Sequence, residues 1–259
     1  MAARAALLLG LWLVSRALPA SELEAARQPT ALIDSRSPAL IAQARALGAG
    51  AASPREQAVA IHDFVRDRIR FGWAPAFYDQ RASEVLAGGV GYCVTKTTLF
   101  VALLRAAEIP ARPRFVDIRA EILEGLIEPG SAYVDHSYAE VWLDGRWIAV
   151  DSYIVDQPYA DQARARLAAA GRSLGGGVHR RGRSDWDGRT PAFSQYLDDG
   201  TVAGLSSRAP AAPADYADAA DYFQRGPVHT RLNPLTRWLF GFFSRGANQR
   251  LEALRAAGR

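Results

Sequence analysis

The stretch DHSYAEVWLDGRWIAVDSY, residues 135–153, decides the fold of this chain. Polar and apolar residues alternate on both sides of Asp144-Gly145, and this alternation is typical of β-strands with one buried face. Asp-Gly between two such runs favours a two-residue type I′ turn, because both turn positions need a positive φ. The stretch therefore predicts an antiparallel hairpin over residues 133–155.

The register of this hairpin places a histidine and an aspartate together. If Leu143 pairs with Arg146 across the turn, Tyr138 lies opposite Asp151. His136 and Asp151 then share one face as diagonal neighbours, about 7–8 Å apart at the backbone. A carboxylate at that range can fix the tautomer of an imidazole. The opposite positions, which we expect to face the core, are Ala139, Val141, Ile148 and Val150.

Cys93 is the only cysteine, so an intrachain disulfide and a multi-cysteine zinc site are excluded. It follows the glycine-rich GGVGY (88–92), which we expect to give a substrate room to approach. The apolar run VTKTTLFVALLRAAEI (94–109), stopped by Pro110, predicts a buried helix. A helix N-terminus favours thiolate and can hold an oxyanion, so Cys93 is a candidate nucleophile. We expect Lys96, in the first turn, to point outward.

Each of these residues alone has a simpler interpretation. Cys93 fits a packed core thiol, His136 a polar strand residue, and Asp151 the end of a strand. Their joint occurrence in this order and geometry favours a catalytic triad instead. The four histidines are scattered and none has metal-ligand spacing with another, so we predict neither a metal nor a cofactor.

The remaining pattern surrounds this hairpin with helices. Helices are predicted from Ser37-Pro38 to Gly48 and from the Ser53 capping box to about residue 72, with His62 a surface or packing residue. Residues 73–92 suggest a loop and residues 112–118 a strand. Beyond residue 156 the pattern gives a helix over 162–170, a glycine- and arginine-rich loop over 171–190 and an Ala/Pro/Asp-rich stretch over 204–220. Ser184 to Gly188 fits a cover for the site or a plain turn.

A last helix, capped by Asn233-Pro234, carries an apolar face. We expect this face to dock on the domain, with a membrane-surface or partner helix as the alternative. The residues of the face are Leu235, Trp238, Leu239, Phe242, Phe243 and Leu251.

Composition limits the partners. The 259 residues carry 31 basic and 27 acidic side chains, a formal charge of 31 − 27 = +4, without a basic stripe that would indicate nucleic-acid binding. The apolar run 5–14 is too short to span a bilayer. Residues 1–20 resemble a signal peptide, but Arg16 also fits an N-terminal extension, so cytoplasmic and periplasmic or secreted locations both stay open.

Three separated blocks resemble the transglutaminase-like superfamily: Gly91-Tyr92-Cys93, then LLRAAEIPAR (103–112), then residues 135–153. Glu108 stands where a glycine is commoner, which should affect only the helix cap. The resemblance implies an α+β, papain-like core over residues 30–156, in which N-terminal helices and the cysteine helix pack on an antiparallel sheet. Residues 157–259 would form a helical and loop-rich extension.

The resemblance also implies Cys93, His136 and Asp151 as the catalytic residues. The thiolate would attack an amide carbonyl of a peptide or protein, and water or an amine acceptor would resolve the thioester. Protease or deamidase and transglutaminase activities both fit; a small-molecule acyl or amide transferase and a non-catalytic interaction module remain alternatives. The candidate cleft residues are Trp73, Tyr78, Gln80, Tyr92, Tyr138, Trp142 and Trp147.

Overall fold

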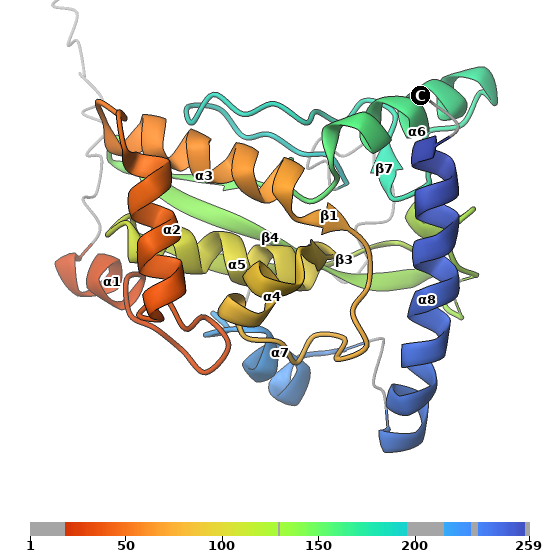
Figure 1. Cartoon of the computed structure of the whole chain (residues 1–259), viewed down its shortest axis with the longest axis horizontal. Helices are drawn as coiled ribbons and strands as arrows, with labels where there is room; N and C mark the ends of the chain where they lie inside the picture. Colours follow the sequence, from red (N-terminus) through yellow and green to blue (C-terminus); the bar gives the residue numbers. More distant parts are fainter. Residues whose placement is uncertain (1–18, 129, 196–214, 229–232, 257–259) are drawn as a thin grey trace, which may run out of the picture.

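The computed structural model describes residues 19–128, 130–195, 215–228 and 233–256. A helical layer packs on a three-stranded antiparallel sheet, so the fold is α+β (Figure 1). The helices before the sheet are α1 (Ala20–Ala25), α2 (Pro38–Gly48), α3 (Pro54–Arg68), α4 (Ala82–Gly88) and α5 (Cys93–Ala106). The sheet has the order β3-β4-β5, formed by β3 (Ala111–Arg119), β4 (Tyr133–Leu143) and β5 (Arg146–Val150).

Helix α5 is the centre of the core. It packs on β3 and β4, while α2, α3 and α4 surround its other sides. Nearly every residue of α5 is buried, as the apolar run predicted. Glu108, just after the helix, has a φ of 59°. This is the left-handed region that glycine adopts most easily, so the glutamate affects the helix cap as expected.

The hairpin has the predicted register. Ala139 pairs with Val150 and Leu143 with Arg146, and both Asp144 and Gly145 have positive φ. The side chains of Ala139 and Val150 are fully buried against the helices. The alternation and the turn dipeptide together were therefore sufficient to fix the pairing.

Two predictions for the region before Cys93 are wrong. Residues 73–92 are not all loop, because they contain α4 and the short strand β2 (Val90–Gly91), which pairs in parallel with β1 (Arg70–Phe71). Gly91 does not make room for a substrate. A Cβ on Gly91 would lie 2.8 Å from Thr95 Oγ1 and 2.9 Å from Lys96 Cγ, so this glycine lets the first turn of α5 pack closely.

Lys96 also differs from the prediction, since its side chain is fully buried. Its Nζ donates hydrogen bonds to the carbonyl oxygens of Arg66 (3.2 Å) and Ile69 (2.6 Å), at the end of α3. Burial lowers the pKa of Lys96 to about 7. Apolar residues lie on all sides of this helix, so the sequence pattern did not show which way Lys96 points.

The segment after the hairpin contains more regular structure than the sequence predicted. The predicted helix over 162–170 begins earlier, and the predicted loop 171–190 contains two short strands. The elements are α6 (Gln157–Ala169), β6 (Leu174–Gly175), β7 (Val178–His179), α7 (Ala219–Arg225) and α8 (Pro234–Ala256), with the 3-10 helix η1 (Ala120–Leu123) placed between β3 and β4.

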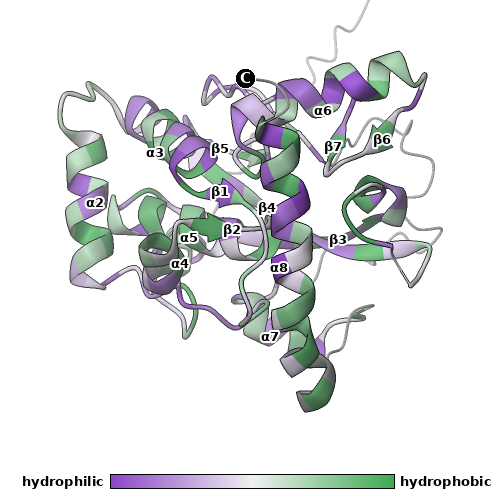
Figure 2. Ribbon diagram, turned by 45° about the vertical axis from the view of Figure 1, so that its right-hand side comes forward, coloured by the Kyte–Doolittle hydropathy of each residue, from purple (hydrophilic) through white to green (hydrophobic). Residues whose placement is uncertain are grey.

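Helix α8 stands along one end of the domain (Figure 1). Its second half docks as predicted, since Ala247 and Leu251 are buried. Its first half differs: Leu235, Trp238, Leu239, Phe242 and Phe243 are all exposed. Figure 2 shows the hydrophobic residues of α8 gathered toward this half.

No helix among the described residues has the length and apolar character needed to cross a bilayer. The signal-peptide prediction falls almost wholly on residues 1–18, and most of the stretch 204–220 also lies outside the described residues.

Candidate active site

The thiol of Cys93 lies at the first residue of α5, where the chain leaves β2. Tyr92 is the N-cap, and its backbone N–H donates to Thr95 Oγ1 at 3.1 Å. Amide groups in the first turn of a helix have no partner inside the helix. The thiol therefore stands beside donors and at the positive end of the helix dipole.

Two hydroxyl groups tie this turn of α5 to strand β4. Ser137 Oγ donates to the carbonyl oxygen of Cys93 at 3.2 Å, and Thr97 Oγ1 donates to the carbonyl oxygen of Ser137 at 3.3 Å. Thr97 Oγ1 also lies 2.7 Å from the hydroxyl of Tyr153, which follows β5. Because Ser137 is the neighbour of His136, these bonds set the position of the thiol relative to the imidazole.

His136 Nε2 lies 3.1 Å from Asp151 Oδ2, and both side chains are fully buried. Cys93 interacts with the same imidazole and raises its pKa. The hairpin register predicted that His136 and Asp151 share a face, and the structure brings both to Cys93. The imidazole thus contacts a thiol and a carboxylate, the arrangement that cysteine nucleophiles use.

The protonated form of His136 is favoured although the ring is buried. Burial opposes the charge, but the hydrogen bond with Asp151 and the electrostatic interactions with Asp151 and Cys93 outweigh it and raise the pKa of His136 to about 9. An imidazolium at neutral pH stabilises a neighbouring thiolate and holds a proton for a leaving group.

Asp151 is fixed by backbone groups that the sequence did not indicate. The backbone N–H of Ser194 donates to Asp151 Oδ1, and the N–H of Gln195 lies 3.3 Å from Oδ2. The N–H of Asp151 in turn donates to the carbonyl oxygen of Ala192 at 3.0 Å. These donors belong to the segment after β7, so the residues beyond 156 complete the site. Backbone amides leave no residue-type signature that a sequence could show.

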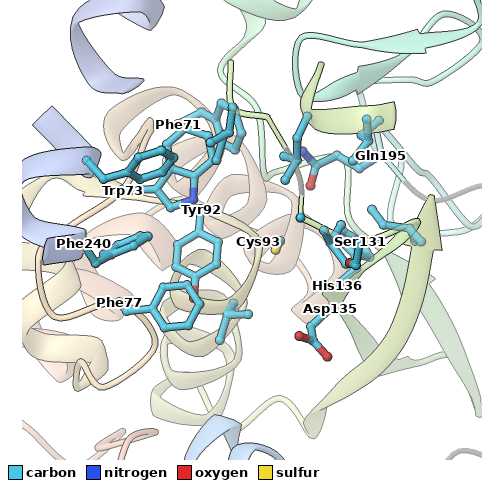
Figure 3. A pocket seen from close by; sticks show the side chains of 18 of the residues that line it. Phe71, Trp73, Phe77, Tyr92, Cys93, Ser131, Asp135, His136, Gln195 and Phe240 are labelled. Carbon is cyan, nitrogen blue, oxygen red and sulfur yellow. The ribbon is translucent and has the colours of Figure 1, made fainter. Parts of the chain in front are cut away.

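Cys93 and His136 open onto a cavity of about 400 Å³. Its size is in the usual range for small-molecule sites. Figure 3 shows Cys93 between an aromatic side and a more polar side. The aromatic and aliphatic lining residues are Phe71, Trp73, Phe77, Tyr92, Val94, Ile118, Ile122, Leu123, Ile127, Val134, Phe223, Phe240 and Phe243. Beside Cys93 and His136, the lining includes Glu128, Gly130, Ser131, Asp135 and Gln195.

Only two of the seven predicted cleft residues, Trp73 and Tyr92, line this cavity. Tyr78 packs instead on Phe223, with ring centroids 3.9 Å apart. Gln80 lies just before α4 and outside the lining. The segment before Cys93 therefore supplies part of the cavity wall, but not all of its predicted residues face the thiol.

The three hairpin aromatics among these predictions also lie outside the cavity lining. Trp142 is six residues beyond His136, about 20 Å along a strand at about 3.3 Å per residue. It packs edge-on against Trp147, with ring centroids 5.4 Å apart. Tyr138 packs with Ile118 in a separate apolar cluster. Sharing a face of a hairpin gives the direction of a side chain but not its distance from the site.

A second serine–histidine–aspartate arrangement joins α3 to the residues that follow β5. His62 Nε2 is 2.8 Å from Ser152 Oγ, and His62 Nδ1 is 2.9 Å from Asp63 Oδ1. His62 and Ser152 are fully buried, so this hydroxyl is closed to a substrate. Burial lowers the pKa of His62. The interpretation of His62 as a packing residue is confirmed; a surface position is wrong.

Residues 184–187 have no regular secondary structure, a bend begins at Gly188, and none of residues 184–188 lines the cavity. Asp187 Oδ1 accepts the backbone N–H groups of Arg189 and Thr190, each at 2.8 Å. Trp186 is buried against His62, with ring centroids 5.6 Å apart. None of these residues lines the cavity of Cys93.

Helix α8 holds the aromatic side of the cavity in place. The side-chain amide of Asn248 accepts the N–H of Trp73 at 2.9 Å and donates to its carbonyl oxygen at 2.8 Å. Gly72 allows this approach, because a Cβ there would lie 2.7 Å from Asn248 Oδ1. Further along α8, Arg255 forms a buried ion pair with Asp156.

Among the described residues, no group of three or more His, Cys, Asp or Glu side chains is placed to hold a metal ion. The Transglutaminase-like superfamily core matches residues 41–152. No curated protein sequence matches the chain. One solved structure with similarity is a candidate cysteine protease from Cytophaga hutchinsonii, at 19% identity and a TM-score of 0.42, over 51% of this chain. The match spans 42% of that chain.

Proposed function

Residues 41–152 of this chain belong to the transglutaminase-like superfamily, and from this premise we propose that Cys93, His136 and Asp151 form the catalytic triad of an acyl-transferring or hydrolysing enzyme. The observation that carries the proposal is the imidazole of His136, which lies 3.1 Å from the Asp151 carboxylate and lines the same cavity as the Cys93 thiol. The thiol and imidazole also line an open cavity.

The proposed reaction begins with the thiolate of Cys93 attacking an amide carbonyl carbon. A carbon–sulfur bond forms, and the oxyanion is stabilised by the amides at the start of α5. His136 then gives its proton to the leaving nitrogen, the carbon–nitrogen bond breaks, and a thioester remains on Cys93. Asp151 keeps the ring oriented throughout.

The second half of the reaction releases the acyl group. Water or a primary amine attacks the thioester, and His136 takes the proton of the nucleophile. Cys93 leaves as thiolate, giving an acid with water or a new amide with an amine. We propose hydrolysis as the main outcome. Transfer of the acyl group to an amine remains the other candidate reaction. A peptide or protein amide remains a candidate acyl donor for either reaction.

The test is capture of the thioester. Wild type is mixed with p-nitrophenyl butyrate, quenched in acid and measured by intact-mass spectrometry. We expect one butyryl adduct that neutral hydroxylamine removes and that Cys93→Ala lacks. His136→Gln should acylate more slowly by at least about 100-fold, the lower end of the usual contribution of a positioned acid–base group.

Two controls sharpen this test. His62→Gln changes a histidine of the second, closed cluster and should leave the acylation rate within about twofold when the variant is folded. Adding a primary amine separates the fates of the thioester, because an amide product signals transfer and butyric acid signals hydrolysis. An adduct that persists in Cys93→Ala, or a Cys93 that reacts no faster than free cysteine, contradicts the proposal.

A further inference from the structure

The cavity at Cys93 is chemically two-sided. Aromatic side chains lie on one side of the thiol, whereas His136, Asp135 and Ser131 lie on the other (Figure 3). An acyl donor has two parts, the acyl group and the leaving amine. Because His136 protonates the leaving nitrogen in the proposed reaction, the amine belongs on the histidine side and the acyl group on the aromatic side.

The aromatic side is a continuous packed wall. Tyr92 stacks on Phe77 with ring centroids 5.5 Å apart, and Trp73 lies 6.4 Å from Tyr92 on its other side. Phe77 meets Phe240 of α8 edge-on at 4.8 Å. Residues from three separate segments thus present ring surface toward the same space. Such a surface binds apolar groups by removing their area from water.

This wall offers little to a polypeptide backbone. The N–H and the carbonyl of Trp73 are both bonded to Asn248. The N–H of Phe71 donates to Asp156 and its carbonyl oxygen accepts from Arg255. The N–H of Gly72 donates to the carbonyl oxygen of Gly91. A peptide laid along residues 71–73 in strand fashion would find these groups taken, and its own polar groups would be buried without partners.

The apolar surface continues out of the cavity along α8. Phe243 lines the cavity and is also 45% exposed. Next to it on the same helix, Leu239 and Phe242 are exposed, followed by Trp238 at 63% and Leu235 at 65%. Exposed apolar surface that extends from a site indicates a ligand with an extended apolar part. A glutamine side chain, with two methylenes and a polar amide, leaves this surface unused.

From these observations we infer that the acyl donor carries an unbranched fatty acyl chain, which lies on the aromatic wall and extends over the first half of α8. The inference rests on the proposed function, since it names the substrate of that same thiol. In the reaction the fatty acyl carbon bonds to Cys93 Sγ and its bond to nitrogen breaks. The amine leaves with the proton from His136, and water releases the fatty acid.

The test uses p-nitrophenyl esters of acetic, butyric and octanoic acid, with the N-acetylphenylalanine ester as a peptide-like competitor. For wild type, kcat/KM should rise about fourfold per buried methylene, the factor that corresponds to the burial of one CH₂ group. The octanoyl ester should therefore exceed the acetyl ester by more than about 100-fold. It should also exceed the N-acetylphenylalanine ester.

Variants of Phe243 test whether the acyl chain of the ester lies on α8. Phe243→Ser should lower the octanoyl-to-acetyl ratio of kcat/KM by at least about tenfold, and Phe243→Leu should restore most of it because it keeps apolar area. Trp142→Leu is the matched control, an aromatic change at the hairpin tip outside the cavity lining, and should leave the ratio unchanged.

Failure of the inference and failure of the proposed function look different. If Cys93 forms an acyl adduct with every ester but kcat/KM is flat along the series, or the N-acetylphenylalanine ester reacts fastest, the fatty acyl inference is overturned and the triad stands. A ratio unaffected by Phe243→Ser overturns the placement on α8. If none of the esters acylates Cys93, the proposed function fails and the inference fails with it.

Discussion

The Asp151 carboxylate is the first of the groups that raise the pKa of His136, which makes Asp151→Asn the most informative perturbation of the site. Burial opposes the charge of the ring, yet its pKa stands at about 9 against an ordinary value of 6.5. The difference between these two pKa values corresponds to about 3 kcal/mol. This is a lower bound on what Asp151 and Cys93 together supply, because they first offset the burial.

The substitution Asp151→Asn would keep a side-chain oxygen for the Ser194 and Gln195 amides but remove the charge. Burial lowers the pKa of His136, and in this variant only Cys93 would oppose that effect. We therefore expect the pKa of His136 to fall below 6.5. The imidazolium would become at least about 300-fold less favoured, the factor equivalent to about 2.5 pKa units. Thioester formation should slow accordingly at neutral pH, because the ring no longer arrives protonated.

The assay is the ¹⁵N chemical shift of the His136 ring between about pH 5 and 10.5, a range that spans the ordinary and the raised pKa, assigned with His136→Gln. Asp135→Asn is the matched control, since Asp135 lines the same cavity but accepts a hydrogen bond from the Tyr222 hydroxyl at 2.7 Å. The ring should still titrate near 9 in that variant. A ring that titrates near 9 in folded Asp151→Asn would refute the reasoning.

The same shift has a consequence for stability, with a defined sign. Folding raises the pKa of His136, so the protonated ring stabilises the folded state. This stabilisation is fully present below pH 6.5 and is lost as the pH rises through 9. The difference in unfolding free energy between wild type and Asp151→Asn should therefore shrink over this interval. Denaturant titrations at about pH 6 and about pH 9.5 measure it.

The remaining predictions concern stability, each measured by denaturant unfolding. The folded-state pKa of Lys96, about 7, lies below its ordinary value of 10.5, so wild type should gain stability as the pH rises from 7 to 10.5. Lys96→Met should lack this gain, and an equal pH dependence of the unfolding free energy in both proteins would contradict the prediction. Glu108→Gly should stabilise by about 1 kcal/mol, because φ is 59° there, and no gain would mean that the glutamate is unstrained. The buried hydroxyl of Tyr92 has no hydrogen-bond partner among the described residues, so Tyr92→Phe should be neutral or stabilise by about 1 kcal/mol; a clear loss would show a missed partner.

The sequence was most informative in the hairpin, where the two-residue repeat of a β-strand determines both the strand pairing and which side chains share a face. A β-strand alternates every second residue, so Asp144-Gly145 fixed the pairing and, with it, the shared face of His136 and Asp151. The start of α5 at Cys93 followed from an apolar run and its preceding glycines. Local rules carried these predictions, and the roles of the three residues stay predictions until the thioester is tested.

What the sequence did not predict depends on contacts between distant segments. The clamp of Asn248 on Trp73 joins residues 175 positions apart, and neither residue type indicates it. The Asp151 bonds to the amides of Ser194 and Gln195 use backbone atoms that every residue but proline carries. Lys96 was assigned to the surface because of its charge, whereas two carbonyls at the end of α3 hold it inside.

The clamp between Asn248 and Trp73 also sets an order of events during synthesis. A ribosome makes residues 93, 136 and 151 before it makes the segment 240–248. The thiol, imidazole and carboxylate can therefore meet in a nascent chain whose aromatic wall still lacks Phe240 and its clamp. The docking of α8 then completes the cavity, so the three side chains of the candidate site can meet before the aromatic wall beside them is complete.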